Sequence, residues 1–171
     1  MRWMRNLLRS DDGGALAELA ILVPFLVVML AAVSELGRYF QAYNTVAKAT
    51  RTASRYLSNH QVNNQESARA ISLVVCGKLS CGVGDKPLAK NFTSSNVCLE
   101  TIGSPKVTSV IVRVVRTSGD CGSVNPAIGG TANAAPYIYQ PTFNIGALLQ
   151  VPSFTLALPI APRTQMYYML D

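Results

Sequence analysis

The first part of the chain is dominated by one long run of apolar positions. Residues 19–34 contain no charged side chain, and extending the run back to Gly13 adds only the charge of Glu18. A helix of about 20 predominantly apolar residues crosses a bilayer core of about 30 Å. The pattern therefore predicts a transmembrane helix over residues 14–34.

Beyond residue 34 the apolar positions become periodic, with steps of three and four residues. This is the period of an amphipathic helix. No proline lies between Pro24 and Pro87, so we expect one helix from about residue 14 to 58, loosened in its membrane half by Pro24. Its predicted apolar face contains Tyr39, Tyr43, Val46, Thr50, Ala53 and Leu57, and its polar face contains Gln41, Asn44, Lys48, Arg51 and Arg55.

The rest of the chain shows shorter patterns. A second helix is predicted over residues 66–75, and residues 117–136, rich in Gly, Ser, Asn, Ala and Pro, predict a long loop. Residues 107–115 alternate as in a strand with one partly solvated face. Gly103-Ser104-Pro105 predicts the turn before it. The predicted strands are 97–99, 107–115, 138–143, 154–160 and 166–170. We expect an α+β fold, in which a small antiparallel sheet packs on the long helix.

Charge gives this chain an orientation. Arg2, Arg5 and Arg9 precede the apolar run, so the positive-inside rule places the N-terminus in the cytoplasm. The net charge is +6, but the basic residues form no run, which argues against a nucleic-acid partner. The expected parts are a cytoplasmic leader (1–13), a transmembrane helix (14–34), its exterior continuation (35–60) and an exterior α+β domain (61–171).

Two simpler interpretations of the apolar run stay open at this point. A cleaved signal peptide would explain the small residues at Ala32-Val33-Ser34. Two features argue against a signal peptide: Glu18 lies at the start of the apolar run, and the helical pattern continues through Ser34. An uncleaved anchor is the other alternative. A charge at mid-bilayer costs about 2.5–3.5 kcal/mol or more, so Glu18 is a functional hypothesis unless its carboxylate merely reaches back to the headgroups.

Several motifs follow one another in order along residues 9–58. They are Gly13-x4-Glu18, a Leu-rich span with Pro24, Glu35-Leu36-Gly37-Arg38, and Ala49-x-Arg51-x-Ala53-x-Arg55-Tyr56. Together they resemble the TadE-like family, pilin-like proteins of the bacterial tight-adherence (Tad) pilus machinery. The resemblance implies a pilin-like fold and, as partners, other pilin subunits, the Tad assembly machinery and a prepilin peptidase. It also implies the inner membrane as location, with the C-terminal domain in the periplasm or in the extracellular pilus.

The resemblance also implies a role for Glu18. Pilin-like precursors are cut after a glycine at the cytoplasmic edge of the span. A cut after Gly13 would make Gly14 the first residue and Glu18 the fifth, whereas a cut after Gly14 would make Glu18 the fourth. The new α-amino group, with a pKa of about 8, would be cationic. Glu18 could neutralise that amine, on its own or a neighbouring chain, in a medium of low dielectric constant.

All four cysteines lie in the exterior part, at positions 76, 81, 98 and 121. In an oxidising compartment an even number of cysteines predicts two disulfides, for which three pairings exist. Cys76–Cys81 with Cys98–Cys121 is preferred because a short loop closes at low cost. A zinc site would need C-x2-C spacing or histidines, but the spacing is C-x4-C and His60 is the only histidine. No metal and no cofactor are expected.

Enzyme chemistry finds little support in the sequence. The exterior acids share no catalytic spacing, no G-x-S-x-G or P-loop motif is present, and no cysteine–histidine pair suggests a nucleophile with its base. We therefore expect no enzyme and no small-molecule substrate. The predicted function is a minor pilin or pseudopilin needed for pilus assembly and adherence. The alternative is an uncleaved membrane-anchored periplasmic scaffold or sensor.

Overall fold

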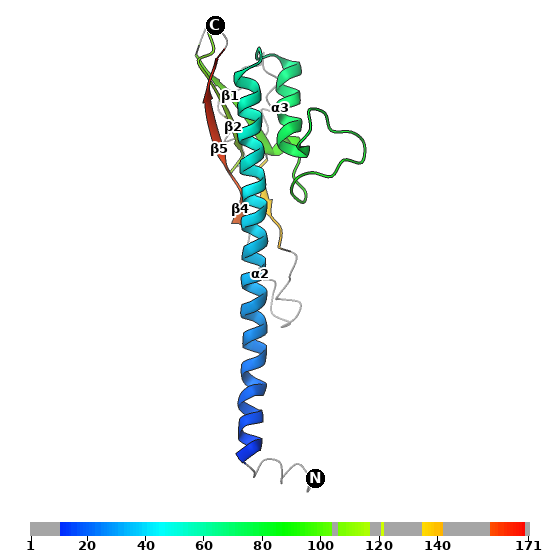
Figure 1. Cartoon of the computed structure of the whole chain (residues 1–171), viewed down its shortest axis with the longest axis vertical. Helices are drawn as coiled ribbons and strands as arrows, with labels where there is room; N and C mark the ends of the chain where they lie inside the picture. The colour runs from blue at the N-terminus through cyan, green and yellow to red at the C-terminus, as the bar shows by residue number, and fades with distance from the viewer. Residues whose placement is uncertain (1–10, 104–105, 117–120, 122–134, 142–157, 170–171) are drawn as a thin grey trace. The chain divides into compact units, whose positions relative to one another are not determined.

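The computed structural model of the chain describes residues 11–103, 106–116, 121, 135–141 and 158–169. It confirms an α+β protein with a long N-terminal helix and a small antiparallel sheet (Figure 1). The chain forms two compact units, residues 1–38 with 141–155 and residues 39–140 with 156–171. The elements are α2 (Asp11–Ser58), α3 (Asn64–Cys76), the 3₁₀ helix η1 (Ser94–Asn96), β1 (Val97–Ile102), β2 (Ser109–Val114), β3 (Ile138–Tyr139), β4 (Leu158–Pro159) and β5 (Arg163–Tyr167).

Helix α2 is continuous over 48 residues and contains Pro24 within it. At a rise of 1.5 Å per residue it is about 70 Å long. It begins three residues before the predicted start at residue 14 and ends at the predicted residue 58. Arg55 lies in its last turn, where a cation interacts favourably with the helix dipole.

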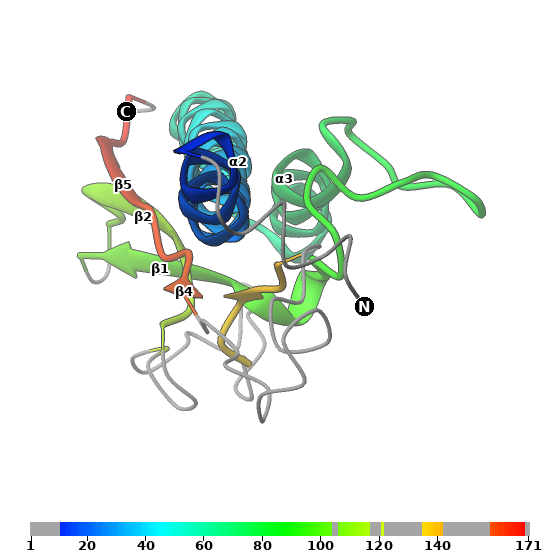
Figure 2. The ribbon, with the colours of Figure 1, turned by 90° about the horizontal axis from the view of Figure 1, so that it is seen from below.

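In the second unit, α2 and α3 lie side by side against the same face of the sheet (Figure 2). The buried side of α2 follows the predicted period, because Val46, Ala53 and Leu57 are fully buried. The predicted polar face is exposed throughout. Tyr43, predicted on the apolar face, is instead 36% exposed. Ala42, one residue earlier, packs against the core in its place, so the buried stripe runs to one side of Tyr43.

The main sheet has the order β1-β2-β5, and both of its pairings are antiparallel. Leu99 faces Val112, and Val112 faces Thr164 across the strands. The hydroxyl groups of Thr164 and Thr50 are 3.2 Å apart, which joins the edge strand to α2. The core cluster between helices and sheet contains Val46, Ala53, Leu57, Ala70, Val74, Ala89, Phe92, Val97, Leu99, Val110, Val112, Val114, Tyr137 and Ile160.

Each of the remaining predicted strands, 138–143, 154–160 and 166–170, overlaps a strand of the structure, and residues 142–143, 154–157 and 170 lie outside the described residues. β3 and β4 form a separate two-stranded ladder in which Ile138 faces Pro159. Each of these strands has only two residues, and Pro159 sits in a strand with a single partner, where its missing N–H is tolerated. β5 begins at Arg163, three residues before the predicted start at Met166.

The second face of β2 is more buried than predicted. Ile111 and Val115 are 2% and 1% exposed, and only Arg113, which lies between them on this face, is partly exposed. Cys98, bonded to Cys121, packs with Val115. A central strand buried on both faces has a nearly continuous apolar sequence, and that is the pattern of β2.

Local capping explains where α3 begins and ends. The Asn63 side chain accepts a hydrogen bond of 2.9 Å from the Glu66 N–H, and Gly77 ends the helix with a φ of 73°. These caps lengthen the predicted helix by two residues at its start and one at its end. In the turn after β1, Gly103 has a φ of 107°, and a Cβ there would lie 2.3 Å from the Lys106 carbonyl oxygen. The predicted loop over 117–136 falls mostly outside the described residues.

Candidate functional site

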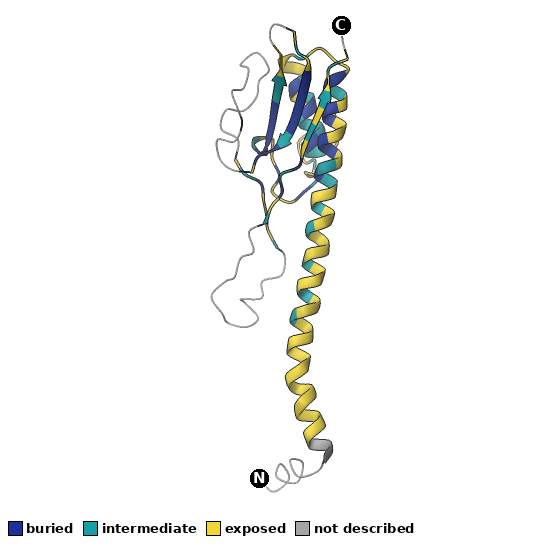
Figure 3. Cartoon of the chain, turned by 90° about the vertical axis from the view of Figure 1, so that its left-hand side faces the viewer, coloured by how far each residue is buried: buried dark blue, intermediate teal, exposed yellow. Residues whose placement is uncertain are grey.

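The first part of α2 is apolar apart from Glu18, and residues 14–27 are all exposed, as the yellow stretch of the helix in Figure 3 shows. Leu19, Ile21 and Phe25 are 55%, 77% and 62% exposed. A helix that is apolar all round is covered by lipid or by other protein, because such a surface is not left bare in water. By length and composition this segment can cross a membrane. It fits a single-pass membrane anchor.

Glu18 lies on this apolar surface. Its side chain is exposed, and it contacts no cation within the part of the chain that the structure describes. Leu19 and Leu22, its neighbours on the helix, are more than half exposed. In an apolar medium, an ionised carboxylate is stabilised at the water boundary or by a cation beside it.

Gly13 and Gly14 both lie within α2, which begins at Asp11. A Cβ added at Gly14 would meet no atom within 4 Å. Crowding inside this chain therefore gives no reason for a glycine there, although glycine destabilises a helix by roughly 1 kcal/mol relative to alanine. The local consequence is a weak first turn, which unwinds more readily than the leucine-rich turns after it.

Pro24 is accommodated without ending the helix. Its ring removes one backbone N–H donor, so the carbonyl four residues earlier loses its intrahelical hydrogen bond. The predicted loosening of the membrane half therefore rests on this missing bond. Its immediate neighbours, Val23 and Phe25, are weaker helix formers than leucine or alanine and do not compensate for this loss.

The Glu35-Leu36-Gly37-Arg38 motif forms one turn of α2 just beyond the apolar run. Arg38 Nη1 lies 3.1 Å from Glu35 Oε2, with the two side chains 54% and 16% exposed. A Cβ at Gly37 would meet nothing within 4 Å. On this turn, Gly37 therefore leaves open space beside the ion pair of Glu35 and Arg38.

The residues of the Ala49-x-Arg51-x-Ala53-x-Arg55-Tyr56 motif lie on two faces of α2. Arg51 and Arg55 are exposed, whereas the side chain of Tyr56 is half-buried and turned toward α3. The Tyr56 hydroxyl donates a hydrogen bond to the Glu66 carboxylate, and its ring stacks on His60 with centroids 4.1 Å apart. Tyr56 thus has a structural role inside this chain, while the two arginines point away from it.

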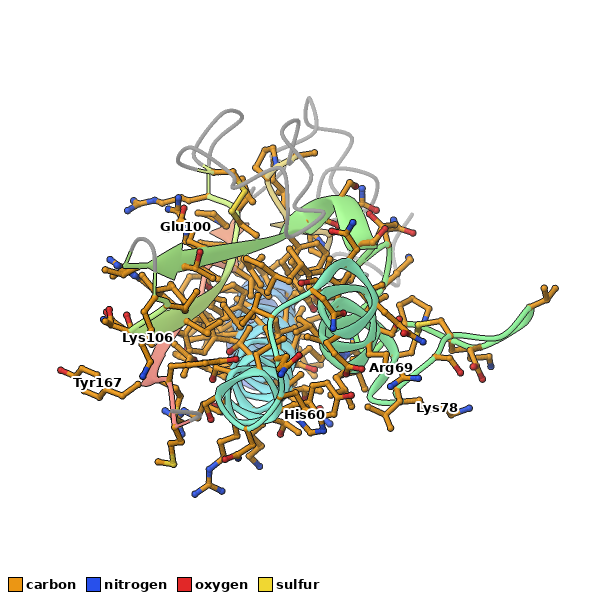
Figure 4. The ribbon with its side chains drawn as sticks, turned by 90° about the horizontal axis from the view of Figure 1, so that it is seen from above. His60, Arg69, Lys78, Glu100, Lys106 and Tyr167 are labelled. Atoms are coloured by element: carbon orange, nitrogen blue, oxygen red, sulfur yellow. A yellow bond between two sulfur atoms is a disulfide. The ribbon has the colours of Figure 1, made fainter. Side chains whose placement is uncertain are left out.

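The contact between Tyr56 and Glu66 was not found by sequence reasoning. Glu66 also binds Arg69 Nη1 at 2.9 Å. The hydrogen bond to Glu66 and partial burial raise the pKa of Tyr56 above its usual value. The sequence signal that could have drawn attention to Glu66 is Asn63-x-x-Glu66, a pattern typical of a helix start. Figure 4 shows His60 at the end of α2 and Arg69 on α3.

The four cysteines form the two disulfides that were preferred from sequence. Cys76 is bonded to Cys81 and Cys98 to Cys121, with Cα–Cα distances of 6.0 and 5.9 Å. The first closes the loop after α3. The second ties β1 to the segment that follows β2. The described residues include no free cysteine.

A pocket of about 450 Å³ lies beside the segment that follows α3. Ile71, Val75 and Phe92 are among the residues that line it. Its one carboxylate, Asp85, is already bound by Lys78 Nζ at 2.6 Å and by the Gly82 N–H at 2.8 Å. Both contacts lower the pKa of Asp85. Among the described residues, no group of three or more His, Cys, Asp or Glu side chains is placed to hold a metal ion.

Comparison with known proteins identifies the segment that contains these motifs. The family model of TadE-like proteins matches residues 13–55, which confirms the resemblance seen in the sequence. The match begins at Gly13 and ends at Arg55, so it covers the apolar run and most of the rest of α2. No curated protein and no solved structure matches the chain. The likeness to TadE-like proteins is thus confined to residues 13–55.

Proposed function

We propose that this chain is a minor pilin or pseudopilin of a tight-adherence (Tad/Flp) type IV pilus. A prepilin peptidase cuts it after Gly13, and the mature subunit is held in the inner membrane until it joins or primes a filament. The observation that supports this most is α2 itself. One helix combines an exposed apolar segment, its single carboxylate at Glu18, and an exterior half packed into a disulfide-bonded domain.

In this proposal the two glycines serve cleavage, and Glu18 serves the step that follows it. Cleavage needs an extended backbone, and the glycine-weakened first turn of α2 supplies one at low cost. The new amino group at Gly14 is then only four residues from Glu18. Neutralisation of that amine, on the same or a neighbouring chain, offsets the cost of both charges in lipid. Gly14 offers an alternative cut one residue later.

The remaining parts of the proposal follow from this topology. Residues 1–13 are the leader, 14–34 the span, 35–60 the exterior continuation, and 61–171 the periplasmic domain. The remaining motif residues either shape the helix along which subunits meet or lie on its surface. They are Pro24, Glu35, Gly37, Arg38, Arg51 and Arg55. The protein has an assembly role, with the membrane, other pilin subunits, the Tad machinery and the peptidase as partners.

The test is the intact mass of the membrane-extracted protein made with and without the peptidase. Loss of residues 1–13 only in the presence of the peptidase is expected. A Gly13→Val variant should remain uncut, because the bulk of the new side chain keeps the backbone at the cut site from fitting the peptidase. Gly37→Val is the matched control, since it makes the same change at an open helix position, and it should be cut normally. Wild-type protein that keeps Met1 beside an active peptidase would indicate an uncleaved anchor instead.

A further inference from the structure

The exterior half of α2 has a row of three positive charges on its solvent side. Lys48, Arg51 and Arg55 are exposed, and their spacing of three and four residues aligns them on one side of the helix. The row extends over about 10 Å. None of these three side chains is paired with a carboxylate within the part of the chain that the structure describes. We refer to them as the basic row.

The carboxylates of the exterior part are engaged elsewhere. Every Asp or Glu side chain that the structure describes beyond residue 34 is paired with another cation. Asp120 and Asp171 lie outside the described residues. The pairs are Glu35–Arg38 at 3.1 Å, Glu66–Arg69 at 2.9 Å, Asp85–Lys78 at 2.6 Å and Glu100–Arg113 at 2.5 Å. Beyond residue 34, a second copy of this chain therefore offers the basic row no unpaired carboxylate from its described residues, and Glu18 lies within the apolar run.

Phospholipid headgroups are too far away to supply the missing negative charge. Lys48 is fourteen residues beyond Ser34, where the apolar run ends. Along a helix this is about 20 Å, more than twice the Debye length of about 8 Å at physiological salt. The neighbours Asn44 and Thr52 are polar rather than aromatic, so the row lacks the stacking groups that single-stranded nucleic acids use.

We propose that the basic row binds an acidic surface of a different subunit in the same assembly. Two of its three members are arginines, whose planar guanidinium binds carboxylates in pairs of hydrogen bonds. The fitting partner is a protein face with carboxylates spaced about one helical turn apart. Such complementary charges select the partner and orient its approach. The inference rests on the proposed function only in placing that partner within the pilus assembly.

The test captures the neighbour of α2 in cells that make the full chain with its native machinery. A photo-cross-linking amino acid replaces the exposed Thr52, and the adduct is identified by mass spectrometry. We expect an adduct with a different subunit at an Asp- or Glu-rich segment. Arg51→Glu with Arg55→Glu should reduce it by about tenfold or more through charge repulsion. Replacing two carboxylates of the captured segment by arginine should restore it.

The matched control is Lys86→Glu with Lys90→Glu, which makes the same charge change at two exposed lysines away from α2 and should leave the adduct intact. Protease resistance of the exterior domain reports folding, and Arg51→Gln with Arg55→Gln repeats the test without added negative charge. Adducts only between copies of this chain, adducts only with lipid or nucleic acid, no adduct, or equal loss in the control would each overturn the inference. Cleavage of residues 1–13, measured in the same cells, tests the proposed function separately.

Discussion

The hydroxyl of Tyr56, in the last turn of α2, donates a hydrogen bond to the carboxylate of Glu66 in the first turn of α3. The same carboxylate binds Arg69, and the Glu66 backbone N–H is held by Asn63. One side chain thus joins the end of the long helix to the start of the next. This contact attaches the last turn of α2 to α3 within the unit of residues 39–140 and 156–171.

Removal of this hydroxyl should destabilise the exterior unit without unfolding it. Tyr56→Phe leaves the ring stacked on His60 and leaves Glu66 paired with Arg69, so we expect a loss of about 1 kcal/mol in the free energy of unfolding. Urea denaturation of the detergent-solubilised chain measures it. Tyr43→Phe is the control, because that exposed hydroxyl has no hydrogen bond within the described residues. Equal losses in both variants would contradict the assigned role.

Stability should fall at alkaline pH through the same contact. The pKa of Tyr56 is raised mainly by its hydrogen bond to Glu66, since ionisation would place two anions together. A raised folded-state pKa contributes stability that is complete below the usual tyrosine value of about 10 and is lost as pH rises through the folded value. Tyrosinate absorbance follows the titration.

A second variant separates Tyr56 from Tyr137, whose pKa is raised by burial. Glu66→Gln should lower the apparent pKa of one tyrosine, and that component should be missing in Tyr56→Phe. If Glu66→Gln left the titration curve unchanged, the carboxylate would not be the cause of the shift.

The two disulfides should differ in what they contribute. Their sequence separations are 5 and 23 residues, for which loop-closure entropy gives about 2 and 3.5 kcal/mol. Replacing Cys98 and Cys121 by alanine should therefore lower stability by about 1.5 kcal/mol more than replacing Cys76 and Cys81. Cys98 is also buried, which adds to the difference. Unfolding of both variants in urea gives the comparison, and alkylation of denatured, unreduced wild-type protein should label no cysteine.

Glu18 should be dispensable for membrane insertion and required for assembly. Glu18→Leu removes a costly group from lipid, so the variant should insert, be cut and accumulate, yet fail to support pili. Glu18→Gln should behave alike, because it keeps the size and loses the charge. Glu18→Asp is the control that keeps a carboxylate and should retain some piliation. Piliation is scored by microscopy beside a blot for the cut form. Full piliation by Glu18→Leu at wild-type protein levels would mean that the charge is tolerated rather than used.

Most of the candidate site lies on one helix and was predictable for that reason. The apolar run, Glu18, Pro24 and the exposed Arg51 and Arg55 follow from periodicity and composition over neighbouring residues. The Cys76–Cys81 disulfide was accessible for the same reason, because a short loop closes cheaply. What could not be predicted were relationships between helices and strands. That Ile111 is buried and Tyr43 is not depends on how elements distant in sequence pack.

By itself, the sequence determined the long helix, its apolar and polar faces, the α+β class and the TadE-like motifs, because each depends on residues within a few turns of one another. The ion pairs Glu35–Arg38 and Glu66–Arg69 lie one helical turn apart and follow from the helix period. Only the tertiary structure decided the contacts between elements, which joined Glu66 to Tyr56 across two helices and Glu100 to Arg113 across two strands. Such contacts act over a few ångströms of space and have no sequence period. The uncompensated state of Lys48, Arg51 and Arg55 therefore became visible only when every described exterior carboxylate had been placed.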